Sequence, residues 1–257
     1  MEYILVSITV LFGAALTFFS GFGLGTLMLP VFSLFFPLPL AVGATAIVHL
    51  SNNMFKFGML FRHIHYPTLL RFGIPALIAA LCGSLILEWF GTMPVLHSYH
   101  LGTYLCEMST LKIVLGSLML FFAWFDLDPR FRAWQLDKKW IPFGGFLSGF
   151  FGGISGHQGA FRSAFLTKAG LTKDEFLGTS NAIALIIDIS RITVYSASLN
   201  FSQLSGIKGI LLTGIVFAFI GTYFGKKLVK KTTLEGVKRI VGVLLLVLGT
   251  FFVLGIL

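Results

Sequence analysis

Charged side chains inside long apolar segments are the first candidates for chemistry in this sequence. Lys56 and Arg191 each stand within an apolar run, and Asp188 precedes Arg191 by one helical turn. A charge at membrane depth costs roughly 2.5–3.5 kcal/mol on insertion scales, so it usually faces a bundle interior or a cavity. Two cations at such depth predict the positive lining of an anion path.

Polar residues accompany both cations at helical spacing. In the earlier segment, spacings of three, four and seven residues place the polar side chains on one face of a helix. The later segment carries polar residues in matching places. The predicted hydrogen-bond donors to an anion are Asn52, Asn53 and Ser180. His49 and Asp188 are the candidates for carrying a proton, and Asp188 is also expected to orient Arg191.

A glycine-rich run at 156–159 predicts a second kind of anion site. It interrupts an apolar segment and is followed by Arg162. The free N–H groups and positive dipole end of a helix that starts after such a break bind anions. A half-helix is expected to start near Gln158, and a matching one near Thr26. The contacts predicted at these breaks are His157, Gln158, Gly159, Arg162, Gly25 and Thr26.

Each of these residues also has a purely structural interpretation, which the sequence leaves open. Asp188 and Arg191 would then be an ion pair one turn apart, and Lys56 would extend to the membrane surface. The glycines would serve close helix packing. His157 would bond to a carbonyl group freed at the break.

A serine in the same run raises an enzymatic alternative. Residues 153–156 match the short pattern G-x-S-G, so a remote alternative is an intramembrane serine protease that uses Ser155. Such a serine needs a base within hydrogen-bond reach, and His157, two residues away in a glycine-rich turn, predicts poor geometry. We expect no enzymatic activity. We also expect no cofactor and no metal, because no carboxylate or Cys completes a histidine site.

Composition identifies the elements that must position these residues as membrane segments. Hydrophobic residues make up 56% of the chain and charged residues 11%, and the mean hydropathy is +0.91, whereas a soluble domain carries about 25% charged residues. The net charge is +9, and the basic residues that give it lie in short loops between apolar runs. This distribution indicates a cytoplasmic face of the membrane rather than a nucleic-acid partner. Cys82 and Cys106 have no disulfide or metal spacing.

The chain is expected to form an all-α polytopic membrane protein with about eight segments. A membrane helix needs about 20 mostly apolar residues. The segments are 2–36, 40–61, 68–90, 110–126, 140–170, 176–199, 206–224 and 237–257. The first and fifth are too long for one span, and each contains a glycine-rich break, at 21–25 and 152–159. Unwound backbone at membrane depth is stable only where protein or a water-filled cavity satisfies it.

The two halves of the chain share a pattern. An alignment without gaps pairs 43–45 with 178–180, Asn53 with Asp188, and Lys56 with Arg191. We therefore expect a first repeat over 1–128 and a second repeat over 138–257, which together form one membrane domain. Duplicated halves with broken helices in matching positions are typical of transporters whose site lies near the bilayer midplane.

Basic loops indicate how the halves are oriented. The clusters lie at 62–71, 130–139, 168–173 and 226–239. Eight simple crossings with parallel halves would place the second and last clusters on opposite sides, against the positive-inside bias. Re-entrant first and fifth segments would place all four clusters on one side, with inverted halves and both termini outside. We prefer the inverted arrangement, and eight simple crossings is the alternative.

On these motifs the chain resembles the TauE/SafE family, described as exporters of sulfite or organosulfonates, over nearly its whole length. The most specific stretch is 151–166, Phe-Gly-Gly-Ile-Ser-Gly-His-Gln-Gly-Ala-Phe-Arg-Ser-Ala-Phe-Leu, and 21–30 resembles the first-half motif. Arg162 stands where the first half has Pro30, and Gly-His-Gln-Gly replaces the usual triple glycine. These departures leave the identity of the cargo open.

Residues and resemblance together predict a secondary transporter. The resemblance implies an exporter of small sulfur-containing oxyanions, such as sulfite or organosulfonates, and Arg, Lys and helix N-termini favour such anions. Alternating access between the repeats is the expected mechanism, an anion channel is the alternative, and a purely structural subunit would leave the charges without a role. The expected location is the bacterial inner membrane, with the lipid bilayer and a small anion as partners and a homodimer as an allowed assembly.

Overall fold

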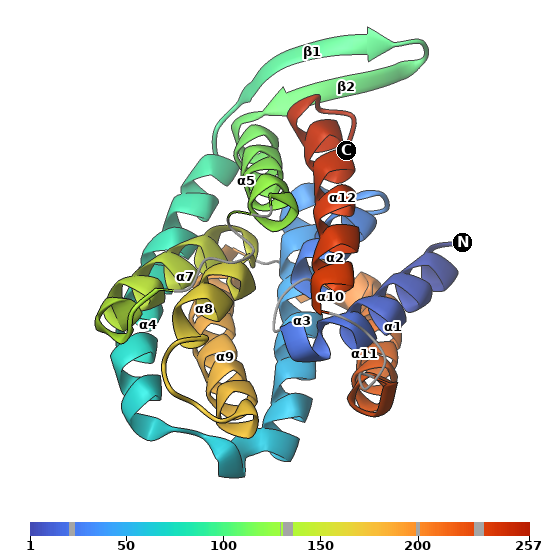
Figure 1. The fold of residues 1–257 in the computed structure, drawn as a ribbon. Coiled ribbons are helices and arrows are strands. Elements are labelled where there is room, and N and C mark those ends of the chain that lie inside the picture. Colours follow the sequence, from blue (N-terminus) through green and yellow to red (C-terminus); the bar gives the residue numbers. More distant parts are fainter. Residues whose placement is uncertain (21–23, 129, 131–135, 199–200, 229–233) are drawn as a thin grey trace.

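The computed structural model describes residues 1–20, 24–128, 130, 136–198, 201–228 and 234–257 of the chain. Within these ranges the chain is almost entirely helical (Figure 1). The helices are α1 (Glu2–Ser20), α2 (Leu24–Ser33), α3 (Leu38–Leu60), α4 (Tyr66–Gly91), α5 (Thr110–Leu127), α7 (Ile141–Ser155), α8 (Gly159–Leu166), α9 (Lys173–Ser198), α10 (Phe201–Gly206), α11 (Lys208–Leu228) and α12 (Leu234–Val253). Two short 3₁₀ turns, η1 (Phe61–His63) and η2 (Lys138–Trp140), and two strands, β1 (Val95–Leu101) and β2 (Tyr104–Ser109), complete the fold.

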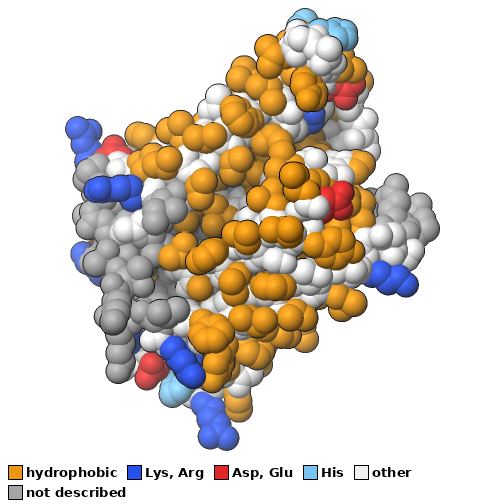
Figure 2. Space-filling model, turned by 90° about the vertical axis from the view of Figure 1, so that its right-hand side faces the viewer, with side chains coloured by type: hydrophobic (Ala, Val, Ile, Leu, Met, Phe, Trp, Pro, Cys, Tyr) orange, Lys and Arg blue, Asp and Glu red, His pale blue; other side chains and the backbone are white. Residues whose placement is uncertain are grey.

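Four of the described helices are long and apolar enough to cross a membrane, namely Tyr66–Gly91, Thr110–Leu127, Lys173–Ala197 and Lys208–Lys227. Shorter apolar helices add to them. Figure 2 shows one face of the molecule on which apolar side chains spread across the middle while Lys and Arg side chains stand toward the edges. Exposure of so large an apolar surface to water is unfavourable. The chain is therefore a mainly helical, multi-pass membrane protein.

The fifth apolar segment is interrupted where its glycine-rich run predicts a break. Helix α7 ends at Ser155, Gly156 adopts a φ of +76°, and α8 begins at Gly159. A positive φ of this size favours glycine because it has no Cβ. In the first segment, α1 ends at Ser20 and α2 begins at Leu24. The glycines at 21–23 lie outside the described residues, as do 131–135 and 229–233 of the basic clusters.

Glycines on α7 allow that helix to lie unusually close to α4. A Cβ added to Gly145, Gly149 or Gly153 would overlap the carbonyl oxygen of Phe72, Ala76 or Ala80, respectively. Small residues at four-residue spacing permit such close approach of two backbones. The partners on the two helices advance together along the chain, so α4 and α7 run in the same direction.

The same kind of packing joins α11 to α1. A Cβ added to Gly221 or Gly225 would overlap the carbonyl oxygens of Leu11 or Ala15. These partners also advance together, so α1 and α11 run in the same direction. Helices α5 and α12 form a third close pair.

The end of α8 lies beside the start of α7. The Leu136 N–H donates to the Ala164 carbonyl oxygen at 3.4 Å. Gly144, in the first turn of α7, faces Phe165 so closely that an added Cβ would overlap its ring. Helix α8 therefore runs back toward the end of α7 from which the segment entered.

A β-hairpin departs from the all-α prediction. Strands β1 and β2 pair antiparallel, and Gly102, with a φ of +65°, lies in the turn between them. The Tyr99 hydroxyl donates to the Leu254 carbonyl oxygen at 2.7 Å, and the Glu107 N–H donates to that of Gly255 at 3.1 Å. The hairpin thus holds the C-terminal end of the chain, and Figure 1 shows both at the end of the molecule opposite η1.

Candidate functional site

Helices α3 and α9 pack side by side and bring the two predicted polar segments together. The Asn181 side chain of α9 donates from Nδ2 to the Asn53 carbonyl oxygen of α3 at 3.0 Å. The helical spacing that predicted one polar face on each helix is therefore used for contact between them. Nearly all of the polar side chains in this contact are buried.

The Asp188 carboxylate is the centre of the cluster, and it is fully buried at 0% exposure. His49 Nδ1 and Asn53 Nδ2 each lie 2.7 Å from Asp188 Oδ2. Gln158 Nε2 donates to Oδ1 at 3.2 Å, and Arg191 Nη2 lies 3.1 Å from the same oxygen. Donors from α3, α9 and the α7–α8 break thus converge on one carboxylate, which stabilises its ionised form.

Arg162 enters the cluster from α8. Its Nε donates to Ser180 Oγ at 2.7 Å and its Nη1 donates to Gln158 Oε1 at 2.9 Å. Because the Gln158 amide also donates to Asp188, it links the second guanidinium to the central carboxylate. Arg162 is 2% exposed, so its charge is withdrawn from solvent.

The Arg191 guanidinium lies against the α7–α8 break. A Cβ added to Gly156 would lie 2.7 Å from Arg191 Nη1. Among the described residues, Nε and Nη2 of Arg191 have no hydrogen-bond partner, since the contact of Nη2 with Asp188 meets the ion-pair distance but not hydrogen-bond geometry. A buried donor without an acceptor is costly, by roughly 1–3 kcal/mol or more when charged. The structure thus holds a buried guanidinium with unused donors.

Lys56 is buried on the same face of α3. Its Nζ lies 5.8 Å from the centre of the Phe18 ring, which offers a cation–π contact. Within the described part of the chain it has no carboxylate partner within ion-pair distance. The Asn52 side chain points elsewhere, because its Oδ1 accepts from Thr222 Oγ1 of α11 at 2.7 Å. The structure brings Lys56, but not Asn52, toward the charged cluster.

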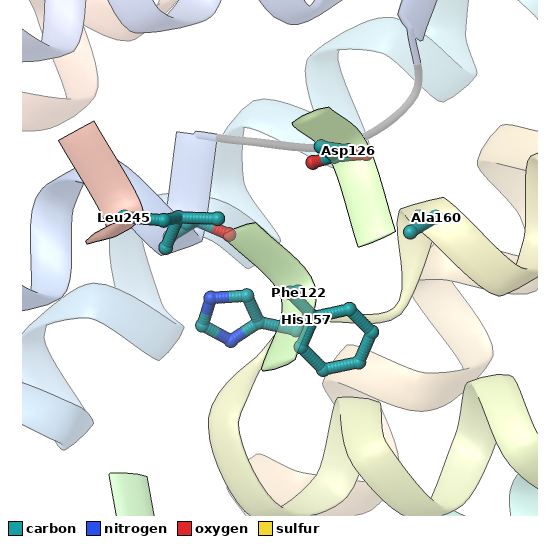
Figure 3. Close-up of a pocket in the computed structure, with 7 residues that line it drawn as sticks. Phe122, Asp126, His157, Ala160 and Leu245 are labelled. Carbon is teal, nitrogen blue, oxygen red and sulfur yellow. The ribbon is translucent and has the colours of Figure 1, made fainter. Parts of the chain in front are cut away.

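The helix starts that follow the two breaks, in α2 and α8, approach the cluster from opposite halves of the chain. Gly25, in the first turn of α2, lies against His49, since an added Cβ would be 3.3 Å from the imidazole Cδ2. Thr26 lines the same small cavity as the first turn of α8. Figure 3 shows this cavity. That cavity is lined by Thr26, Phe122, Asp126, His157, Gly159, Ala160 and Leu245. Its free space of about 10 Å³ for a water centre fits about one water molecule.

Asp126 and Phe122 of α5 are cavity residues that sequence reasoning missed. Asp126 is 2% exposed. In the sequence, Asp126 is a carboxylate at the end of an apolar segment. Nothing in the sequence indicates that this end lies beside the α7–α8 break. The predicted residues that meet in the cluster are His49, Asn53, Gln158, Arg162, Ser180, Asp188 and Arg191. Asn52 does not, and Thr26, His157 and Gly159 line the neighbouring cavity.

Ser155 and His157 lie closer than the sequence suggested. His157 Nδ1 is 2.9 Å from Ser155 Oγ and 3.2 Å from the Ser155 carbonyl oxygen. A carbonyl oxygen only accepts, so Nδ1 carries the hydrogen, and Ser155 Oγ in turn donates to the Phe151 carbonyl oxygen at 3.0 Å. A base that activates a serine needs the opposite donor direction. The two side chains are thus close enough for a catalytic dyad, but the imidazole donates to the serine hydroxyl and cannot accept its proton through Nδ1.

Comparison with known proteins agrees with the membrane fold. The family model described as sulfite exporter TauE/SafE matches residues 6–252. No curated protein and no solved structure gives a match. Since the family model spans nearly the whole chain, the protein belongs to the TauE/SafE sulfite exporter family.

Proposed function

We propose that the chain is a secondary transporter that exports a small sulfur-containing oxyanion, such as sulfite or an organosulfonate. The family description names sulfite export. The observation that carries the proposal is the buried Arg191 guanidinium, whose Nε and Nη2 have no hydrogen-bond partner among the described residues. A planar guanidinium with two free donors matches the oxygens of such an anion.

The charge balance of the cluster supports an anionic cargo. Lys56, Arg162 and Arg191 contribute three buried cations, against the buried carboxylates of Asp188 in the cluster and Asp126 at the neighbouring cavity. Burial of unbalanced charge is costly. An anion that binds among the three cations reduces the imbalance and supplies acceptors at the same time.

The other polar residues position these cations. Asp188 holds Arg191 and His49, and Gln158 and Ser180 fix the Arg162 side chain. We assign Asn53 to the support of Asp188, and Gly159, Gly25 and Thr26 to the half-helix starts that face the anion. The His49–Asp188 pair is a proton-coupling candidate, since one group could accept the proton that the other releases.

Alternating access needs two units that move relative to each other. The pairing of α1 with α11, and of α7 with α4, supports two related repeats over 1–128 and 138–257, because each pair joins the first helix of one half to the third apolar segment of the other. The return of α8 beside α7 supports a re-entrant segment. The cations of the cluster are buried, and the neighbouring cavity at the helix starts has room for about one water molecule. A sulfur oxyanion therefore reaches the cations only if the two units separate.

Flux in proteoliposomes tests the proposal. Vesicles with the full chain are loaded with sulfite or methanesulfonate, and release is followed against a concentration gradient and a pH gradient. Saturable release that can be driven uphill supports a transporter, and Arg191→Ala should abolish it. Arg71→Ala, at an exposed arginine of α4, is the matched control. Flux that neither saturates nor moves uphill would favour the anion channel.

A further inference from the structure

His157 presents its basic nitrogen to the small cavity at the helix breaks. Its Nδ1 lies 3.2 Å from the Ser155 carbonyl oxygen, which can only accept, so the hydrogen of the neutral ring is on Nδ1. Nε2 therefore carries the lone pair. Nε2 is buried and has no hydrogen-bond partner among the described residues, and His157 is one of the cavity-lining residues.

The same cavity is lined by a buried carboxylate. Asp126 reaches it from α5, and Figure 3 shows Asp126 and His157 on different walls of the cavity. The cavity has room for about one water molecule, which needs two to four polar partners. His157 Nε2, the Asp126 carboxylate and the Thr26 side chain are the groups that could supply them.

One neighbour of the imidazole favours a positive charge on it. The Phe122 ring stacks on the His157 ring, with centroids 5.0 Å apart and planes inclined by 8°. An aromatic face attracts a cation. Phe122 and Asp126 are four residues apart on α5, so one face of that helix presents both groups to His157. Figure 3 shows the two rings side by side.

The charged groups around His157 come from different elements. From α5 Asp126 favours protonation of the imidazole, and from α9 Arg191 opposes it, since its Nη1 lies against the neighbouring Gly156. The cavity-lining residues of α2 and α12, Thr26 and Leu245, carry no charge. Burial of the ring also opposes its protonation. His157 therefore binds a proton only where Asp126 and the Phe122 ring outweigh burial and Arg191.

We propose that His157 and Asp126 form a proton-binding site, separate from the His49–Asp188 pair, that couples proton uptake to anion binding. A proton taken from solvent is held on His157 Nε2 and shared with Asp126 through one water. This inference rests on the proposed function, because the coupling acts through the anion. An anion beside Arg191 screens the charge that opposes protonation, and a protonated His157 attracts the anion in return, as linkage requires.

The coupling has a structural route. His157 directly precedes Gln158, whose amide joins Arg162 to Asp188. Gly156, on the other side of His157, touches Arg191. A change of charge at His157, just before the start of α8, therefore alters the electrostatic environment of both guanidinium groups.

The test follows the protonation of His157 itself. The full chain, labelled with ¹⁵N-histidine and purified in detergent, is titrated from pH 8 to pH 3 by NMR, and His157→Gln identifies the signal. We expect Nε2 to change from a bare to a protonated nitrogen within this range. In Asp126→Asn the change should need a pH lower by about one unit, the effect of removing a nearby opposite charge. Phe122→Leu should give a smaller shift in the same direction.

A matched control and a second arm separate this inference from the transport proposal. Asp174→Asn, at an exposed carboxylate of α9, should leave the titration unchanged. Methanesulfonate, which stays an anion throughout, should raise the pH at which His157 is protonated. A titration that Asp126→Asn does not move, or a His157 signal that stays unprotonated down to pH 3, overturns the proton site. A correct titration that methanesulfonate leaves unmoved overturns the coupling, whereas failure of transport alone shows in the flux experiment.

Discussion

His49 Nδ1 and Asp188 Oδ2 lie 2.7 Å apart although 139 positions separate the two residues in the chain. The pair joins α3 to α9 deep in the molecule, where Asp188 also contacts Arg191. The carboxylate thus compensates a guanidinium and an imidazole together. Its removal is more than the loss of one contact, because it leaves the groups around it without their acceptor.

We expect Asp188→Ala to destabilise the protein by about 3–5 kcal/mol, the usual effect of breaking a buried ion pair. Thermal unfolding in detergent measures the change. Asp188→Asn should recover a part of it, since an amide oxygen still accepts hydrogen bonds. Asp137→Ala, at an exposed carboxylate, should stay within about 0.5 kcal/mol of wild type. Equal stability of Asp188→Ala and wild type would contradict the central role of this carboxylate.

We expect anion binding to depend on the guanidinium group of Arg191 and not only on its positive charge. A ligand that binds the folded state raises the melting temperature by mass action. We expect one or more of sulfite, sulfoacetate, taurine, thiosulfate, sulfate and chloride to do so with wild type. The shift should vanish in Arg191→Ala and be reduced in Arg191→Lys, because an ammonium lacks the planar pair of donors. An undiminished shift in Arg191→Ala would place the anion elsewhere.

The polar cluster was predictable because it follows a helical period. Lys56 and Asn53 stand on one face of α3, and their counterparts Arg191 and Asp188 stand on one face of α9. A regular helical period determines which side chains share a face. Because charged side chains are costly in contact with lipid, the two polar faces pack against each other. Asn53 and Asp188, aligned as equivalents in the sequence, are in direct contact at 2.7 Å.

Asp126 and the β-hairpin escaped prediction for different physical reasons. The cavity of Asp126 exists only because α5 packs near the α7–α8 break, and no local pattern in either segment indicates that neighbour. The hairpin consists of two strands of seven and six residues, too short for a strong alternating signal between apolar helices. Its cue was Gly102, which takes the positive φ of the turn.

Because α7 packs closely on α4, replacement of a glycine of α7 at the contact should destabilise the protein. In Gly149→Ala the added Cβ overlaps the Ala76 carbonyl oxygen, so the two helices must separate. We expect a loss of about 1–3 kcal/mol, as for other overpacked interiors, measured by thermal unfolding in detergent. Gly58→Ala is the matched control, since an added Cβ there meets nothing within 4 Å and alanine favours helix. A neutral Gly149→Ala would show that the helices are not held this close.

Lys56 offers the sharpest separation of a transport role from a structural one. Its ammonium is buried, and no described carboxylate lies within ion-pair distance, so its charge adds cost rather than stability. We expect Lys56→Met to keep or raise the melting temperature while it lowers anion flux in proteoliposomes at least about tenfold, because an apolar side chain of similar length replaces an uncompensated charge. Lys139→Met, at an exposed position, should change neither quantity. A loss of stability in Lys56→Met with normal flux would instead mean that the ammonium holds the fold together and takes no part in moving the anion.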